Sequence, residues 1–134
     1  IKVQYYITAC SNDAMQYAVL EAMEKASSYP DEMRNEFQTR RDLITTRLNQ
    51  MDGVSCHEPK GAFYVFPKFD TPGLNSEQLA IEMLNEGVLC SPGSAFGASG
   101  EGHLRFAYTI SKPDIDRGMD RVAKVIERIS GKGD

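Results

Sequence analysis

The chain has 134 residues, 41% of them hydrophobic, which is enough for one domain with its own core and short for two. Its 15 basic and 19 acidic side chains give a net charge of -4, which argues against a nucleic acid partner. Apolar runs such as AFYVF are far shorter than the roughly 20 residues that cross a bilayer, so we do not expect a membrane protein.

The cysteines and the N-terminus bear on location. Cys10, Cys56 and Cys90 are an odd number without CxxC spacing, which predicts free, mostly buried thiols in a cytoplasmic protein. We do not expect secretion, because the N-terminal segment does not resemble a basic and apolar secretory leader. It opens with IKVQYYIT and without an initiating Met, so we expect a piece of a longer protein. His57 and His103 both lie beside predicted turns and offer little to a metal site.

Two helices are predicted in the first part of the chain. Apolar residues recur at helical spacing over residues 12–25, behind Ser11, Asn12 and Asp13, any of which can cap the first turn. The helical pattern breaks at Pro30, which suits the first turn of a second helix running to about Met51. That helix has an apolar stripe of Met33, Phe37, Ile44, Leu48 and Met51. Its arginines alternate with acids, which favours a solvated face over a binding patch.

The remainder of the chain alternates short strands with two more helices. Residues 54–56 and 62–67 read as strands of a hairpin around a HEPKG turn. A third helix opens at Ser76 and ends at residues 85–87, and residues 88–90 form a strand. A glycine-rich run leads to a strand over residues 103–108, and a last helix runs from about Pro113 to Ile129. This order predicts an α+β domain in which helices cover one face of a small mixed or antiparallel sheet.

The glycine-rich run, CSPGSAFGASGEG, matches neither common phosphate motif. No GK[ST] follows its glycines, and GEG opens a strand where a dinucleotide fingerprint would open a helix. Glycines at 93, 97, 100 and 102 indicate that side chains are kept out of some space, next either to another backbone segment or to a ligand.

Arg105 is the candidate binding residue. Alternation along HLRFAY puts it on the strand face opposite Leu104, Phe106 and Tyr108. A guanidinium held on a strand beside an uncrowded loop suits bidentate binding of a carboxylate. The alternative is an exposed strand arginine or one in a salt bridge with an acid of this chain.

Three stretches carry a family resemblance over nearly the whole chain: SNDAMQYAVLEAME, then MRNEFQTRRDLITTRLNQMDGVSCHEPKGAFYVFP, then GVLCSPGSAFGASGEGHLRFAY. Together they resemble the C-terminal part of class I/II aminotransferases, the pyridoxal-phosphate enzymes of the aspartate aminotransferase fold. The resemblance implies that residues 1–29 are an interdomain linker helix and residues 30–134 the small C-terminal domain.

The resemblance also implies site residues. Arg105 matches the arginine that pairs with the substrate α-carboxylate. Phe63 matches an aromatic position on the substrate side of the pocket, with ordinary strand packing as the alternative. Ser11 and Asn12 match positions near the active site of a neighbouring subunit, with a plain helix cap as the alternative.

The same resemblance predicts what the chain lacks. The Schiff-base lysine and the other pyridoxal phosphate ligands belong to a large domain upstream, and Lys60 and Lys68 match other parts of the pattern. We therefore expect a fragment, inactive alone, of a homodimeric enzyme that transfers an amino group between an amino acid and a 2-oxo acid. Which amino acid it uses is not predicted. The alternatives are a free-standing module that binds small carboxylates or a protein, and a domain that only dimerises.

Overall fold

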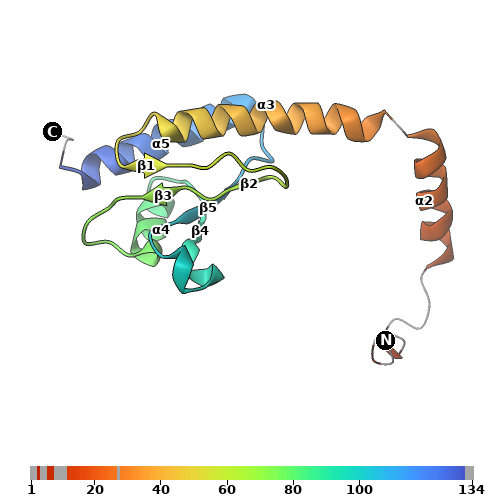
Figure 1. The fold of residues 1–134 in the computed structure, drawn as a ribbon, viewed down its shortest axis with the longest axis horizontal. Helices are drawn as coiled ribbons and strands as arrows, with labels where there is room; N and C mark the ends of the chain where they lie inside the picture. Colours follow the sequence, from red (N-terminus) through yellow and green to blue (C-terminus); the bar gives the residue numbers. More distant parts are fainter. Residues whose placement is uncertain (1–2, 4–5, 8–11, 27, 132–134) are drawn as a thin grey trace. The chain divides into compact units, whose positions relative to one another are not determined.

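The computed structural model describes Val3 and residues 6–7, 12–26 and 28–131, and it divides into two compact units, Ile1–Glu36 and Phe37–Asp134 (Figure 1). The boundary falls inside helix α3 (Tyr29–Asn49), so that helix belongs to both units. The division of the chain into a linker and a domain stays a prediction. None of the described helices is long and apolar enough to span a membrane.

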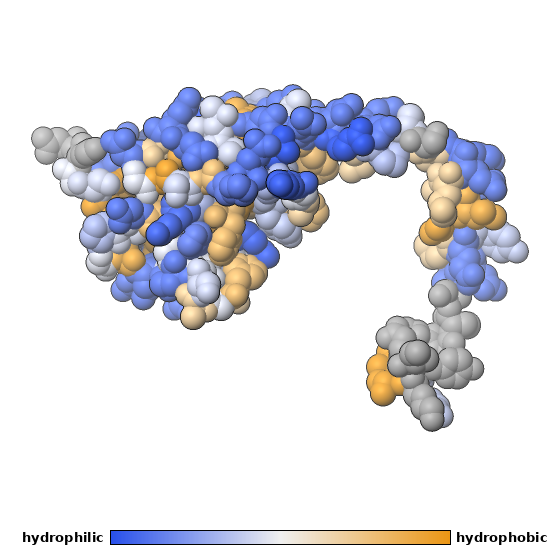
Figure 2. Space-filling model, viewed as in Figure 1, coloured by the Kyte–Doolittle hydropathy of each residue, from blue (hydrophilic) through white to orange (hydrophobic). Residues whose placement is uncertain are grey.

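The first unit contains helix α2 (Asp13–Lys25), which the apolar spacing predicted. The Asn12 side chain accepts a hydrogen bond from the backbone N–H of Met15 at 3.2 Å, so Asn12 caps this helix. Ser11 and Cys10 lie outside the described residues. No residue of α2 is buried, and Figure 2 shows apolar side chains on its surface.

Helix α3 starts and ends within two residues of its predicted bounds. Ile44 and Leu48 of its apolar stripe are buried, and Phe37 and Met51 pack against the core, whereas Met33 is exposed. The predicted stripe therefore faces the core over the part of the helix that belongs to the second unit.

Five short strands form two antiparallel sheets in the described part of the chain. Strand β1 (Val54–Ser55) pairs with β3 (Lys68–Phe69). Strand β5 (Leu104–Ala107) lies between β2 (Tyr64–Val65) and β4 (Ser91–Pro92). The last strand in sequence is thus the centre of its sheet, and its residues have a neighbouring strand on each side.

The predicted hairpin between residues 54–56 and 62–67 is wrong. Val54 pairs with Phe69, and residues 64–65 pair with β5 instead. The backbone of Cys56 bonds to a side chain instead of to a neighbouring strand. The Asn49 side chain accepts a hydrogen bond from the Cys56 N–H at 2.8 Å and donates one to the Cys56 carbonyl at 2.9 Å. The amide side chain takes the place of a strand partner and ends β1.

The strand predicted at residues 88–90 begins later, at Ser91. The Val88 N–H donates to the Met83 carbonyl, and the Gly87 N–H donates to the Leu84 carbonyl, both at 2.8 Å. Gly87 has φ +80°, so this is a Schellman cap that ends helix α4 (Ser76–Asn85). Since the cap uses the Val88 donor, the chain joins the sheet only after it.

One cluster of buried side chains joins the helices to the strands of the second unit. Helix α5 (Lys112–Ile129) contributes five of its residues, Ile115, Met119, Val122, Val125 and Ile126. Figure 1 shows α5 and the second-unit part of α3 along the same side of the strands. Val65, Leu104 and Phe106 are buried toward this cluster, whereas Tyr64 and Ala107, on the other face, are exposed. The predicted α+β class with one covered sheet face is confirmed.

Candidate carboxylate-binding site

Arg105 lies in the central strand β5 with its side chain on the face away from the core. Leu104, Phe106 and Tyr108 are buried and Arg105 is half-buried, so the predicted alternation along the strand is confirmed. Arg105 is paired in register with Ser91 of β4, and its Nη2 donates to the Ser91 Oγ at 3.5 Å. The guanidinium is therefore held at the open face of the sheet.

Two aromatic rings contact the Arg105 guanidinium. Its Cζ lies 4.4 Å from the ring centroid of Tyr64 and 4.4 Å from that of Phe96. Tyr64 belongs to β2, on one side of β5, and Phe96 follows β4, on the other side. We call Arg105, Ser91, Tyr64 and Phe96 the Arg105 cluster. Both rings remain partly open, with 36% of Tyr64 and 52% of Phe96 exposed.

Arg105 has no carboxylate within ion-pair distance among the residues that the structure describes. Other arginines differ: Arg41 pairs with Asp42 at 2.7 Å and Glu58 at 3.1 Å, and Arg47 pairs with Asp116 at 3.2 Å. The hydrogen bond to Asp42 raises the pKa of Arg41 above its ordinary value. Arg41 and Arg47 of α3 are thus paired with acids, but both are half-buried and Arg47 pairs with an acid of α5, so they do not lie on the solvated face that the sequence predicted. Arg105 keeps donors for a ligand.

The glycine-rich run packs its own backbone closely. A Cβ on Gly93 would overlap the carbonyl oxygen of Gly100 and lie 2.6 Å from that of His103. The Gly93 N–H donates to the same His103 carbonyl at 2.8 Å. Of the two explanations for these glycines, close approach to another backbone segment accounts for positions 93 and 100. The short helix η1 (Gly93–Phe96) that presents Phe96 depends on this crossing.

Glu101 fastens the glycine-rich run to helix α4. Its carboxylate accepts from the Ser76 N–H at 2.6 Å, the Ser76 hydroxyl at 2.8 Å and the Gly102 N–H at 3.1 Å. The hydrogen bond from the Ser76 hydroxyl, followed by those from the two backbone amides, lowers the pKa of Glu101. Glu101 was not predicted as a site residue, although its place in GEG shortly before Arg105 is a sequence signal for it.

Phe63 lies beside the Arg105 cluster. Its ring centroid is 4.6 Å from that of Tyr64 and 6.4 Å from that of Phe37, and 40% of the residue is exposed. The turn before it is fixed by buried Tyr108, whose hydroxyl donates to the Ala62 carbonyl at 2.9 Å. Phe63 therefore neighbours Arg105 through Tyr64, and its role in the site stays a prediction.

Cys56, Cys90 and His103 are packed residues rather than candidate ligand-binding groups. Cys56 and Cys90 are free, and burial raises the pKa of each thiol to about 11, so both are protonated at neutral pH. Cys56 is buried and Cys90 is half-buried. The His103 ring stacks on Phe66 at 5.0 Å. No group of three or more metal-ligating residues was found in the described part of the chain.

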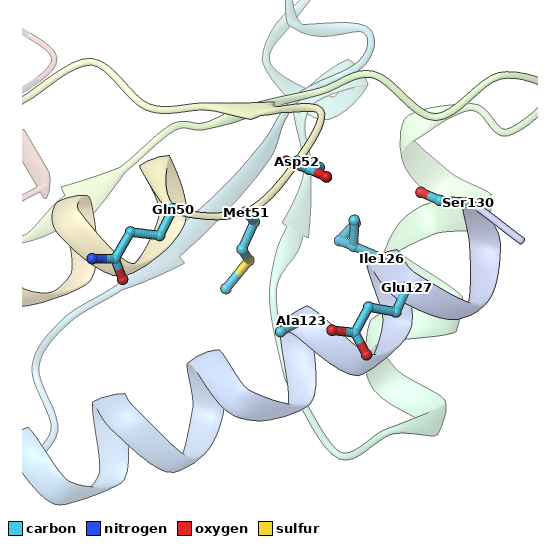
Figure 3. A pocket seen from close by; sticks show the side chains of 7 residues that line it. All are labelled: Gln50, Met51, Asp52, Ala123, Ile126, Glu127 and Ser130. Atoms are coloured by element: carbon cyan, nitrogen blue, oxygen red, sulfur yellow. The ribbon is translucent and has the colours of Figure 1, made fainter. Parts of the chain in front are cut away.

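Two pockets lie away from the Arg105 cluster. The one in Figure 3, of about 360 Å³, lies between the residues that follow α3 and the C-terminal end of α5, and its charged lining residues are Asp52 and Glu127. Two carboxylates disfavour an anionic ligand there. A second pocket, of about 410 Å³, includes Arg117 and Arg121 of α5. Arg117 pairs with Asp114, and Arg121 donates to the Gly87 carbonyl at 3.3 Å.

Comparisons with known proteins agree on one family. The family model for class I and II aminotransferases matches residues 4–122. The chain is 38% identical to the aromatic-amino-acid aminotransferase 2 of Thermococcus litoralis over 130 residues, and 40% identical to the aspartate aminotransferase of Pyrococcus abyssi over 129 residues. These alignments cover 95% and 94% of this chain but 33% of each relative, so the chain spans about a third of their length.

Solved structures give the same result. The aromatic aminotransferase of Pyrococcus horikoshii OT3 superposes with a TM-score of 0.87 at 38% identity, covering 95% of this chain and 35% of that one. The aspartate aminotransferase of Rhizobium meliloti superposes with a TM-score of 0.85 at 30% identity, covering 95% of this chain and 34% of that one. Fold and sequence thus point to the same group of enzymes.

Proposed function

We infer the function of this chain from its family: it belongs to the class I and II aminotransferases, and we propose that it supplies the carboxylate-binding part of such an enzyme. The observation that carries the proposal is Arg105, a guanidinium held at an open sheet face without an acid partner among the described residues. A planar fork of donors matches the two oxygens of a carboxylate.

The proposed substrates are an amino acid and a 2-oxo acid, between which the full-length enzyme moves an amino group. In both, the carboxylate is attached to the carbon that gains or loses the amino group, so one arginine can hold either substrate. Holding that carboxylate orients the substrate and removes much of the entropy cost of the reaction. The relatives are named for aromatic amino acids and for aspartate, so the proposal concerns the group that these substrates share.

The family implies pyridoxal phosphate as the cofactor of the full-length enzyme. Its chemistry is the stabilisation of negative charge on the substrate carbon, and it needs a lysine that reaches into a closed pocket. Every lysine that the structure describes is exposed: Lys25, Lys60, Lys68, Lys112 and Lys124. These exposed lysines therefore do not fit the pyridoxal phosphate cofactor. We propose that another part of a full-length, homodimeric enzyme holds the cofactor, and that this chain alone has no transaminase activity.

Phe63 is proposed to line the substrate side of the same site. Its exposed ring and its contact with Tyr64 support this role, since both rings belong to one aromatic surface beside Arg105.

The test uses NMR to measure the affinity of pyruvate, a small 2-oxo acid, for the chain and for two arginine variants. We expect Arg105→Ala to weaken binding about tenfold or more, because a charge-assisted hydrogen bond contributes about 1.5–3 kcal/mol. Arg117→Ala is the control, since Arg117 is an exposed arginine already paired with Asp114. Equal binding by the chain and Arg105→Ala, or equal loss in both variants, would contradict the proposal.

A further inference from the structure

The Arg105 guanidinium is restrained by two rings rather than by an acid. Tyr64 reaches it from β2 and Phe96 from η1, on the two sides of β5, and each ring centroid is 4.4 Å from the Arg105 Cζ. A cation over the face of an aromatic ring is attracted by the ring's negative face. The rings therefore hold the flat guanidinium while leaving the N–H groups at its edge available, apart from the one that reaches Ser91.

Phe96 is itself supported. Phe66 packs edge-on against Phe96 at 5.9 Å and stacks on His103 at 5.0 Å with an interplanar angle of 11°. His103 is adjacent to the backbone crossing at Gly93, and its Nδ1 lies 3.0 Å from the Glu101 carbonyl oxygen. The ring that contacts Arg105 thus packs against Phe66, which is itself stacked on His103, and this packing orders the ring before any ligand arrives.

This arrangement has a consequence for the shape of the ligand's head group. A carboxylate pairs with a guanidinium in one plane through two parallel N–H···O bonds. A sulfonate that uses two oxygens in the same way projects its third oxygen out of that plane, and an oxygen on a side where a ring lies meets the face of that ring. The negative face of the ring repels that oxygen. The rings thereby favour a flat anion over a tetrahedral one of the same charge.

We propose that Tyr64 and Phe96 are positioning residues that hold Arg105 edge-on to its ligand and make the site selective for planar carboxylates over tetrahedral anions. This inference rests on the proposed carboxylate-binding function. It adds two residues, and a preference between anion shapes, that the family assignment alone does not supply.

The experiment measures the affinity of this chain for benzoate and for benzenesulfonate, two monoanions that differ only in the head group. We expect benzoate to bind at least about threefold more tightly. Tyr64→Leu and Phe96→Leu each remove a ring, and each should weaken benzoate binding about threefold to tenfold and bring the ratio of the two affinities toward one. Tyr64→Phe and Phe96→Tyr keep the ring and should retain both the affinity and the ratio.

The outcomes separate the two proposals. Unchanged benzoate binding in Arg105→Ala, or no benzoate binding by the unsubstituted chain, overturns the carboxylate site and the inference with it. Loss in Arg105→Ala with unchanged affinity and ratio in both leucine variants overturns only the role of the rings. So does an equal affinity of the unsubstituted chain for the two anions. If a leucine variant loses its folded NMR spectrum, the ring-retaining variants test the proposal instead. Weaker benzoate binding by Tyr64→Phe would then assign the effect to the tyrosine hydroxyl and overturn the role of the ring.

Discussion

Arg105 is contacted by different groups from Arg41, Arg47 and Arg128 on the helices. Arg41, Arg47 and Arg128 each lie against a carboxylate of this chain, whereas Arg105 lies against two rings and a hydroxyl. A ligand carboxylate that reaches Arg105 does not have to displace an internal acid. Aromatic rings solvate a cation less strongly than water does, so binding of an anion to the guanidinium remains favourable.

The sequence predicted Arg105 and its face but not its neighbours. Alternation over residues 103–108 is a local property, so it identified the buried and the open sides of β5. Tyr64 and Phe96 come from segments that meet Arg105 only through strand pairing. Nothing in the spacing of HLRFAY or AFYVFP states which strands pair, and these contacts became visible only in the folded chain.

Glu101 gives a prediction on pH. Its pKa is lowered in the folded chain, so its contribution to stability is present above the ordinary value of 4.5 and is lost as the pH falls through the lowered pKa. Glu101→Gln should therefore be less stable than the unsubstituted chain at pH 7, and the difference should shrink at acidic pH. Urea unfolding at several pH values measures this.

The control for Glu101 is Glu77→Gln. Glu77 is an exposed acid in the first turn of the same helix α4, and it takes no part in the hydrogen bonds around Ser76. We expect this variant to follow the unsubstituted chain. A stability difference for Glu101→Gln that is the same at every pH would contradict the assignment of the carboxylate to these hydrogen bonds.

At the scale of elements, helices were predictable and strand partners were not. The bounds of α3, α4 and α5 agree with caps and apolar spacing within two residues, because both signals are local. The two errors concern strands, and each has a local polar cause. Asn49 occupies the backbone groups of Cys56, and the Schellman cap of α4 occupies the N–H of Val88. Apolar runs alone do not reveal such competition for backbone donors.

Alanine substitutions at two glycines should have opposite effects on the free energy of unfolding. Gly93→Ala puts a Cβ into the backbone at Gly100 and His103, so we expect a loss of at least about 2 kcal/mol in the free energy of unfolding. Gly118→Ala, inside helix α5 with no atom within 4 Å of the new Cβ, should gain about 0.5–1 kcal/mol. Urea unfolding measures both. Similar effects of the two substitutions would contradict the close crossing in the glycine-rich run.

At the scale of the whole molecule, a chain about a third as long as its relatives still builds one continuous core. Residues 37–134 form a compact unit with a buried face and an open aromatic face, so the unit can present Arg105 on its own. Apolar residues are exposed on α2 and around the Arg105 cluster, and exposed apolar patches are typical of interaction surfaces. Dimerisation and a cytoplasmic location remain predictions at this scale.

The most direct measurement is a crystal structure of this chain soaked with pyruvate. We predict one pyruvate at the open face of β5, with two Arg105 nitrogens about 2.7–3.2 Å from its two carboxylate oxygens and the carboxylate in the guanidinium plane. Pyruvate bound instead beside Arg117 and Arg121 on α5, with Arg105 still in contact only with Tyr64, Phe96 and Ser91, would contradict the account.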